Sequence, residues 1–383
     1  MIRIWVLSFF LLSITNGEAQ KPIVKVGAEQ LNQLLPLLKG KRVGLVVNNT
    51  SLVGNTHLAD TLISCKVQVK RIFGPEHGFR GDAADGEHVK DAMDPKTGVP
   101  VVSLYGKNYK ATPEQVKDLD ILIFDIQDVG ARFYTYISTM YYLMETCAEN
   151  NKQLIILDRP NPNGSYVDGP IMQPELKSFV GLLPIPITHG MTVGELAQMI
   201  NGEGWLEGGK KCNLSVIKMK NWNHNDDYSL PVRPSPNLPN DQAIRLYPSI
   251  CLFEGTVISL GRGTSMPFQV LGNPALKEML FTFTPVPITG VSIEPPLKNK
   301  LCYGMDLRAI TPARKVDLQY LLLFYQKYPE KEKFFTAYFD KLAGTTQLKQ
   351  QIKDGQTEEQ IRASWKPGLD AFNAKRKKYL LYP

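Results

Sequence analysis

The sequence is poor in cysteine, and the cysteines that it has are far apart. Among 383 residues it contains five, with no C-x-x-C pair and no pair of histidines nearby: Cys65, Cys147, Cys212, Cys251 and Cys302. This spacing argues against both a zinc site and a disulfide framework. The odd number leaves at least one free thiol, and a single disulfide stays open. We therefore expect no metal site.

Motifs that bind nucleotides are also missing. No G-x-G-x-x-G follows the first predicted strand, and no G-x-x-x-x-G-K-[ST] occurs, so the usual cradles for dinucleotides and nucleoside triphosphates are absent. The formal net charge of +7 is mild, and the basic run 375–378 follows an amphipathic helix pattern. Such a run is typical of a solvated last helical turn. We expect neither an organic cofactor nor a nucleic-acid partner.

Long apolar runs are absent after the N-terminus. Arg3 precedes an apolar run from Ile4 to Ile14, and small residues follow around Ala19. This run of 11 residues is shorter than the roughly 20 that a spanning helix needs. The pattern predicts a signal peptide over residues 1–19 and an exported protein, periplasmic or secreted, without stable membrane insertion. An uncleaved signal anchor is the alternative.

Residues 41–160 alternate between short apolar runs and amphipathic segments, which predicts a doubly wound α/β domain. The expected strands are 43–47, 67–73, 99–104, 121–126 and 154–157. The expected helices are 57–64, 112–119 and 133–150. Strand 67–73 alternates in polarity and is expected nearer a sheet edge. A mixed α/β pattern continues to the C-terminus, so we expect one domain over 20–185 and a smaller one over 186–383.

Each expected strand is followed by a polar or glycine-rich loop. These loops hold Asn48–Ser51, Gly74–Gly78, Tyr105–Gly106, Asp125–Arg132 and Asp158–Gly164. Because the carboxyl ends of parallel strands meet at one sheet edge, the loops predict a shared polar pocket. Carboxylates, amides and an arginine in one cleft suit a polyhydroxylated ligand.

Glu76 and His77 are the central candidates for chemistry. They follow strand 67–73 and a Gly-Pro pair, so they are expected at a carboxyl strand end, where a braced carboxyl group is a candidate for proton transfer. The alternative is a tight turn whose glutamate and histidine are merely solvated.

The other candidates have structural alternatives. Asp125 and Asp128 are able to cap the helix expected near Phe133, and Arg132 to pair with one of them. Tyr134 and Tyr136 are two residues apart at a helix start, so we expect at most one to face the cleft.

The second half adds two candidate side chains. His189 lies just before a capping box formed by Thr192 and Glu195, and either faces the cleft or ends the preceding segment. Arg262 lies in a Gly-Arg-Gly sequence after an expected apolar strand, where it either meets a carboxylate or is exposed in a surface turn. The Pro/Asn-rich stretch 222–241 predicts a long loop, and such loops inside compact proteins are usually either functional or disordered.

Several sequence blocks, in order over nearly all of the mature chain, resemble the exo-acting β-N-acetylmuramidases of the NamZ type. They are Phe73–Gly81, Asp125–Tyr136, Asp158–Pro162, His189–Thr192, Glu254–Thr256 and Gly261–Thr264. The resemblance implies a Rossmann-like N-terminal catalytic domain, a C-terminal α/β domain and an active-site cleft between them. It further implies release of terminal β-linked N-acetylmuramic acid from peptidoglycan-derived saccharides, with the catalytic glutamate matching Glu76.

The implied chemistry assigns further roles. Glu76 protonates the leaving oxygen, His77 orients the sugar, and either Asp125 or Asp128 activates water or the substrate's N-acetyl oxygen attacks. An arginine pair would recognise the lactyl carboxylate, and the candidates are Arg132 and Arg262, with Arg80 third. The expected substrate-binding residues are Asn49, Arg80, Arg132, Tyr134, Tyr136, Asp158, Asn161, His189, Glu254 and Arg262.

Two other functions compete with this interpretation. One is a different hydrolase in the same cleft, such as an exo-N-acetylglucosaminidase or an amidase. The other is a non-catalytic periplasmic module that binds cell-wall fragments. The sequence gives no indication of an oligomeric state.

Overall fold

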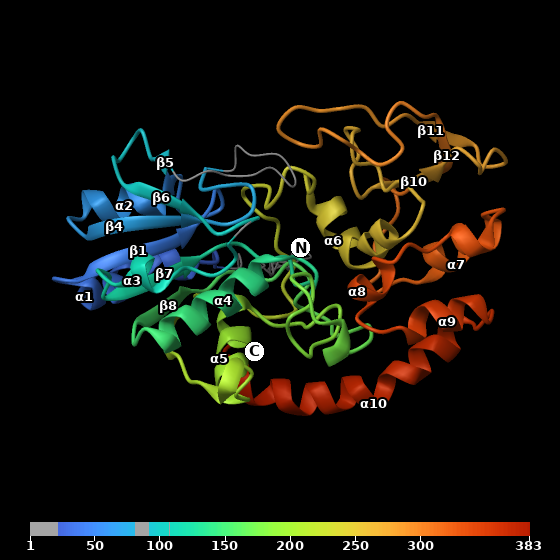
Figure 1. Cartoon of the computed structure of the whole chain (residues 1–383). Coiled ribbons are helices and arrows are strands. Elements are labelled where there is room, and N and C mark those ends of the chain that lie inside the picture. Colours follow the sequence, from blue (N-terminus) through green and yellow to red (C-terminus); the bar gives the residue numbers. More distant parts are fainter. Residues whose placement is uncertain (1–21, 81–91, 107) are drawn as a thin grey trace, which may run out of the picture.

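A seven-stranded sheet forms the first half of the chain (Figure 1). The computed structural model describes residues 22–80, 92–106 and 108–383, so the predicted signal peptide at 1–19 and Gly81 lie outside the described residues. The sheet has the order β5-β6-β4-β1-β7-β8-β9, and only β5 pairs in the antiparallel direction. Its strands are β1 (Arg42–Val47), β4 (Gln68–Gly74), β5 (Ala92–Met93), β6 (Pro100–Ser103), β7 (Ile121–Asp125), β8 (Gln153–Leu157) and β9 (Asn213–Ile217). The predicted doubly wound α/β fold is confirmed.

Helices cover both faces of this sheet because its strands are apolar on both sides. Along β1, Val43, Leu45 and Val47 pack in one apolar cluster and Val46 in another. The first cluster includes side chains of α1 (Leu31–Leu38) and α2 (Leu58–Ser64). The second includes side chains of α3 (Pro113–Val116), α4 (Tyr136–Glu149) and α5 (Val193–Gly202). A small hairpin of β2 (Leu52–Val53) and β3 (Thr56–His57) precedes α2.

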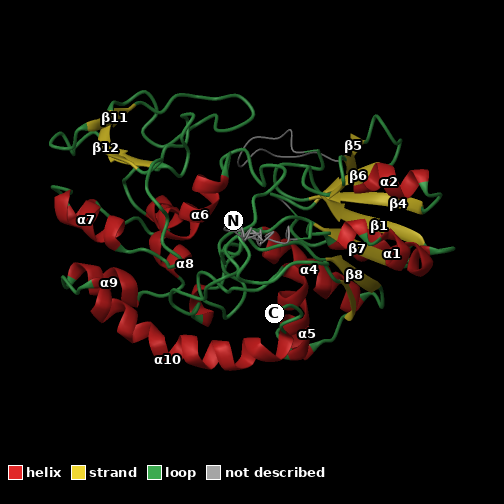
Figure 2. Ribbon diagram, turned by 180° about the vertical axis from the view of Figure 1, so that it is seen from behind, coloured by secondary structure: helices red, strands yellow, loops and turns green. Residues whose placement is uncertain are grey.

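Two expectations about this sheet need correction. β4 is an interior strand between β6 and β1, and its alternating start, half of it exposed, explains why it resembled an edge strand. β9 lies beyond residue 185 and pairs in parallel with β8, so the sheet continues past the boundary expected there. The carboxyl ends of the parallel strands face the second half of the chain (Figure 2).

The second half is built around a three-stranded antiparallel sheet. It consists of β10 (Val270–Asn273), β12 (Cys302–Asp306) and β11 (Phe281–Phe283) in that order. The helices are α6 (Asp241–Ile250), α7 (Gln319–Lys327), α8 (Phe339–Ala343), α9 (Gln347–Lys353) and α10 (Glu358–Arg376). The strand expected before Arg262 was wrong, because Cys251–Gly255 forms a 3-10 turn followed by irregular chain.

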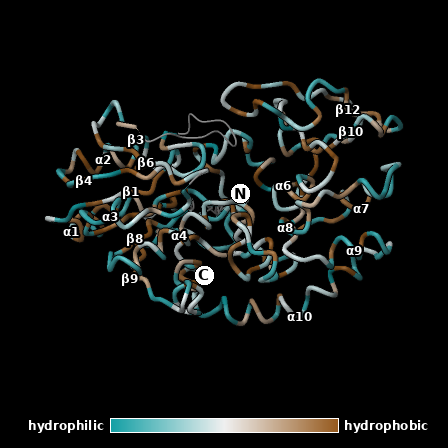
Figure 3. The backbone as a smooth tube through the Cα atoms, viewed as in Figure 1, coloured by the Kyte–Doolittle hydropathy of each residue, from teal (hydrophilic) through white to brown (hydrophobic). Residues whose placement is uncertain are grey.

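The two halves share one apolar core. A single cluster of buried side chains runs from Phe124 and Met140 to Phe253 and Phe324. Hydrophobic segments accordingly occur in the interior of both halves, including the central strands (Figure 3). The chain then returns along α10 to the first half, where Tyr382 donates a hydrogen bond to the Asp158 carboxylate at 2.7 Å. No helix among the described residues is long and apolar enough to cross a membrane.

Candidate active site

The loop after β4 holds Glu76 in a strained turn. His77 adopts φ 67° and Gly78 φ 76°, both in the left-handed region, and the Gly78 amide donates to the Pro75 carbonyl at 2.9 Å. A side chain in this region costs roughly 1 kcal/mol or more, and such strain is concentrated at functional sites. The turn places Glu76 and His77 side by side at the carboxyl end of the sheet.

The start of α4 fixes the Glu76 side chain. Thr135 Oγ1 donates to Glu76 Oε2 at 3.0 Å, and the Tyr136 hydroxyl lies 3.4 Å from the Glu76 carbonyl oxygen. Both residues are buried or nearly so. The carboxyl group therefore has a defined position before any ligand arrives.

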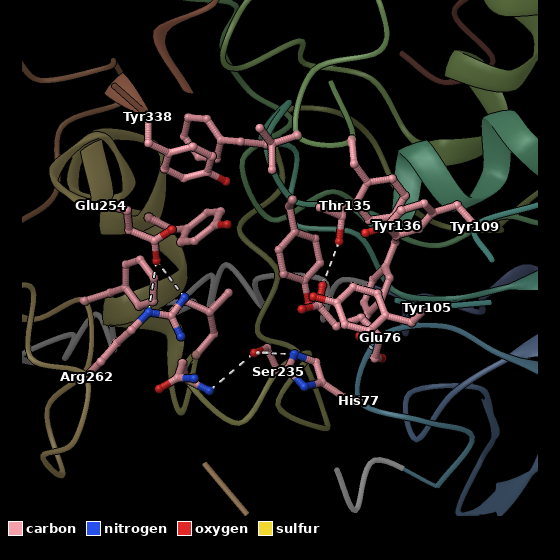
Figure 4. Close-up of a pocket in the computed structure, with 18 residues that line it drawn as sticks. Glu76, His77, Tyr105, Tyr109, Thr135, Tyr136, Ser235, Glu254, Arg262 and Tyr338 are labelled. Atoms are coloured by element: carbon pink, nitrogen blue, oxygen red, sulfur yellow. Dashed lines mark hydrogen bonds and ion pairs between the residues drawn. The ribbon is translucent and has the colours of Figure 1, made fainter. Parts of the chain in front are cut away.

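A cavity of about 350 Å³ lies over this carboxyl group, between the two halves (Figure 4). This volume is at the lower end of the range for small-molecule sites. The first half contributes Glu76, His77, Tyr105, Tyr109, Phe133, Tyr134, Thr135, Tyr136, Phe179 and Val180, and the second half contributes Ser235, Asn237, Leu238, Tyr247, Glu254, Arg262, Phe268 and Tyr338.

Tyr134 and Tyr136 both line this cavity, so the expectation that only one faces it was wrong. α4 begins at Tyr136, and Tyr134 lies in the preceding turn, where helical spacing does not apply. Their rings meet edge to face, with centroids 5.0 Å apart.

The predicted long loop closes one side of the cavity. Tyr134 donates to the Pro234 carbonyl at 2.8 Å, and Ser235 Oγ lies 3.4 Å from His77 Nε2. Asn49 Nδ2 donates to the Arg233 carbonyl at 3.2 Å, so Asn49 supports this loop and does not line the cavity.

An ion pair forms the wall across from Glu76 (Figure 4). Arg262 Nε and Nη2 donate to Glu254 Oε1 at 2.9 and 2.6 Å, and the guanidinium lies 5.1 Å from the centre of the Phe268 ring. The Arg262 side chain is 16% exposed. It is thus held at the cavity by a carboxylate and an aromatic face. A further hollow of about 740 Å³ shares Glu254, Arg262 and Tyr338 with the cavity.

Asp125 and Asp128, the other carboxylates predicted to be catalytic, do not line the cavity. Asp125 is fully buried and pairs with Arg159, whose Nε and Nη2 donate at 2.6 and 2.9 Å. Asp128 accepts a bond from the Gly130 amide at 2.6 Å, and burial raises its pKa to about 7. Neither caps α4, and neither pairs with Arg132, contrary to both alternatives drawn from the sequence.

Arg132 connects the two halves and does not line the cavity. Its guanidinium is buried and donates to the carbonyls of Pro170, Ile185, Leu342 and Ala343 at 2.7–2.9 Å. Burial lowers its pKa to about 9. The geometry gives no support to its expected contact with a lactyl carboxylate.

The remaining predicted residues also have protein partners and do not line the cavity. Arg80 pairs with Asp94 at 2.9 Å. Asp158 accepts bonds from Thr192 Oγ1 at 2.7 Å and the Gly194 amide at 2.9 Å, and burial raises its pKa to about 6.

Asn161 and His189 support neighbouring main chain. Asn161 Nδ2 donates to the Met191 carbonyl at 2.9 Å, and His189 Nδ1 accepts from the Met191 amide at 3.2 Å. Burial lowers the pKa of His189 to about 3. The capping box of Thr192 and Glu195 is confirmed.

Several lining residues were not predicted. Thr135 lies in a block that the sequence singled out, and Ser235 and Asn237 lie in the predicted long loop, so these had a signal. Tyr338 comes from a distant segment with no motif around it. Across the described ranges, no group of three or more His, Cys, Asp or Glu side chains is placed to hold a metal ion.

Comparison with known proteins identifies the family. The N-terminal model of the exo-β-N-acetylmuramidase NamZ family matches residues 43–242, and its C-terminal model matches residues 245–382. The chain belongs to the NamZ family. The two NamZ models meet near the start of α6, beyond β9, whereas the sequence placed the boundary after residue 185.

Similar proteins agree with this membership. The chain is 44% identical to the peptidoglycan β-N-acetylmuramidase NamZ of Bacillus subtilis strain 168, over 96% of this chain and 93% of that protein. Two crystal structures of DUF1343 family proteins from Bacteroides fragilis NCTC 9343 are similar, each covering 94% of this chain and 99% of its own. One is 48% identical with a TM-score of 0.88, and the other is 32% identical with a TM-score of 0.80.

Proposed function

We propose that this protein is a glycoside hydrolase that releases the non-reducing terminal β-linked N-acetylmuramic acid from peptidoglycan-derived saccharides. The observation that carries the proposal is the Glu76 carboxyl group, fixed by Thr135 in a cavity between the two halves. Membership of the NamZ family and 44% identity to a peptidoglycan β-N-acetylmuramidase support the substrate class.

Glu76 is the general acid of this reaction. Its proton passes to the glycosidic oxygen as the bond from that oxygen to C1 breaks, and water then supplies the new oxygen at C1 and returns a proton. His77 lies beside it in the same cavity and orients the sugar through a hydrogen bond. Asp125 and Asp128 are left out of this reaction, because neither lines the cavity.

Two groups are candidates for the reaction at C1 on the face of the sugar opposite to Glu76. Glu254 is the other carboxylate among the described lining residues, and it lies across the cavity in its pair with Arg262. The alternative is the substrate's own N-acetyl oxygen, which would make the reaction substrate-assisted. Glu254→Gln distinguishes the two possibilities, because it abolishes turnover only if Glu254 itself reacts. NMR of the first-formed anomer then shows whether the configuration at C1 is retained or inverted.

Arg262 recognises the lactyl carboxylate that distinguishes N-acetylmuramic acid from N-acetylglucosamine. Its guanidinium is held at the cavity edge by Glu254 and Phe268. Because the Arg262 side chain is already held in position, it loses less conformational entropy when a carboxylate binds.

The decisive test is hydrolysis of a β-N-acetylmuramide whose leaving group is an alkyl or sugar oxygen, such as methyl β-N-acetylmuramide, because such an oxygen must be protonated to leave. Wild type is expected to release the sugar, and Glu76→Gln to lose at least about a hundredfold in kcat, because general acid catalysis contributes roughly 10²–10⁴. Asp125→Asn is not a suitable control, since it breaks a buried ion pair, whereas surface Glu114→Gln is. Full activity of Glu76→Gln would remove Glu76 from this role, and binding without turnover by wild type would favour a binding module.

The proposed site of action is outside the cytoplasm. The pattern over residues 1–19 supports a cleaved signal peptide, and the substrate is a cell-wall saccharide. N-terminal sequencing of the mature protein should start at Gln20. A mature protein that retains Met1 would contradict export by this route.

A further inference from the structure

A group of aromatic rings lines one end of the cavity and has no part in the proposed reaction. Tyr109 and Phe179 stack with ring centroids 4.1 Å apart, and Tyr105 meets Tyr109 edge to face at 6.0 Å. All three line the cavity and are partly exposed. We call Tyr105, Tyr109 and Phe179 the aromatic wall.

The chain presents one of these rings at the tip of a tight turn. Ser178 and Gly181 exchange two main-chain hydrogen bonds of 3.1 and 2.9 Å, which leaves Phe179 and Val180 at the tip. Ser138 of α4 donates to the Phe179 carbonyl at 2.6 Å and holds this turn in place. Tight turns usually carry Gly, Asn, Asp or Pro at the tip, so an apolar pair facing a cavity indicates a binding role.

The aromatic wall lies on the Glu76 side of the cavity. Figure 4 shows Tyr105 and Tyr109 near Glu76, across the cavity from Glu254 and Arg262. Tyr338 and Phe268 add rings at the far end, so the two ends differ in charge and not in aromatic content. One end holds the Glu254–Arg262 pair, and the other holds the aromatic wall with the proposed acid near it.

The arrangement of Arg262, Glu76 and the aromatic wall matches the arrangement of the lactyl group, the glycosidic oxygen and the leaving group in the substrate. The lactyl ether is on C3 of N-acetylmuramic acid and the leaving group is on C1, so the two leave the ring in different directions. With the lactyl group at Arg262 and the glycosidic oxygen at Glu76, the leaving group points toward the aromatic wall. A pyranose has an apolar face of C–H groups, which packs against aromatic rings, and a polar rim.

We propose that the aromatic wall is the subsite for the leaving-group sugar, an N-acetylhexosamine, and that Tyr109 and Phe179 set the preference for a saccharide leaving group. This inference rests on the proposed function, because it takes Glu76 as the acid and Arg262 as the lactyl contact. The competing possibility is that the rings only pack the loops after β6 and β8 against each other.

The experiment compares two leaving groups on one sugar. Hydrolysis of the N-acetylmuramyl-N-acetylglucosamine disaccharide is measured beside hydrolysis of methyl β-N-acetylmuramide, which has nothing to place on the aromatic wall. Tyr109→Leu and Phe179→Leu keep apolar volume but remove the ring. Each is expected to lower kcat/KM for the disaccharide about three- to tenfold and to leave the methyl substrate unchanged.

Tyr142→Leu is the matched control. Tyr142 belongs to the same ring cluster, with its centroid 6.4 Å from that of Phe179, but it does not line the cavity. It should leave the ratio between the two substrates unchanged. An equal loss on both substrates in the Tyr109 and Phe179 variants, or no loss on either, would overturn the subsite. Failure of wild type to cleave either substrate would instead refute the proposed function.

Discussion

Arg132 and Arg262 were both candidates for the lactyl contact, and the structure predicts that their removal has different effects. Loss of Arg132 should lower the stability of the protein, and loss of Arg262 should lower its preference for the muramide. Arg132 donates to four main-chain carbonyls from two distant segments. Arg132→Ala leaves these carbonyls without their donor in a buried place. Arg262→Ala removes a partly exposed pair at the cavity edge.

The expected loss of stability follows from these bonds. Four bonds to a charged donor, at the low value of about 1.5 kcal/mol each, sum to about 6 kcal/mol. Water that enters the vacated space satisfies some of the carbonyls, so we expect Arg132→Ala to lower the free energy of unfolding by about 3–5 kcal/mol. For Arg262→Ala we expect about 1 kcal/mol or less, as for other partly exposed ion pairs.

Two assays on the same variants separate stability from recognition. Thermal melting should show a Tm several degrees lower for Arg132→Ala and close to wild type for Arg262→Ala. The ratio of kcat/KM for β-N-acetylmuramide over β-N-acetylglucosaminide should stay unchanged in Arg132→Ala and fall about tenfold or more in Arg262→Ala. An Arg132→Ala protein with wild-type Tm and a lost muramide preference would refute this reasoning.

Three further predictions concern stability and thiols. Between about pH 4 and 7 the folded protein keeps the Asp128 proton that the unfolded chain releases, so stability falls as pH rises through this window. Asp128→Asn should remove that slope and stabilise the protein at pH 8 by up to roughly 4 kcal/mol, measured by denaturant unfolding across pH. Tyr382→Phe should cost about 1–3 kcal/mol, seen as a lower Tm, because the bond to Asp158 is lost. Thiol titration should find one reactive cysteine, Cys65, in the native protein and five after unfolding; three after unfolding would reveal a disulfide.

The strands were predictable because a short apolar run between two polar loops is typical of a buried parallel strand. Strand 121–126 was observed as 121–125, and strand 154–157 as 153–157. β9 was missed because its sequence, Asn-Leu-Ser-Val-Ile, is only partly apolar and mostly half-buried. The short α6 was hidden by Pro248 within it and by the Pro/Asn-rich loop before it.

The sequence predicted where the candidate site lies, but only some of the residues that line it. The rule that strand ends converge placed Glu76 and His77 correctly in the cavity. It gave no direction for side chains that follow a strand, so it could not show that Asp125 turns toward Arg159. Arg132 binds main-chain carbonyls, and because every residue has one, the residue types in the sequence could not identify these partners.

The shared core and the Arg132 bonds have a consequence for the way saccharides enter and leave. Swinging the halves apart would expose the apolar cluster that spans them and separate Arg132 from the carbonyls of Leu342 and Ala343. The C-terminal tail holds the same halves together through Tyr382. The cavity is therefore preformed, with fixed walls. Crystal structures with and without the sugar should superimpose closely across both halves. Selection among saccharides then depends on what fits through the existing mouth, and release of the product does not wait for a large rearrangement of the protein.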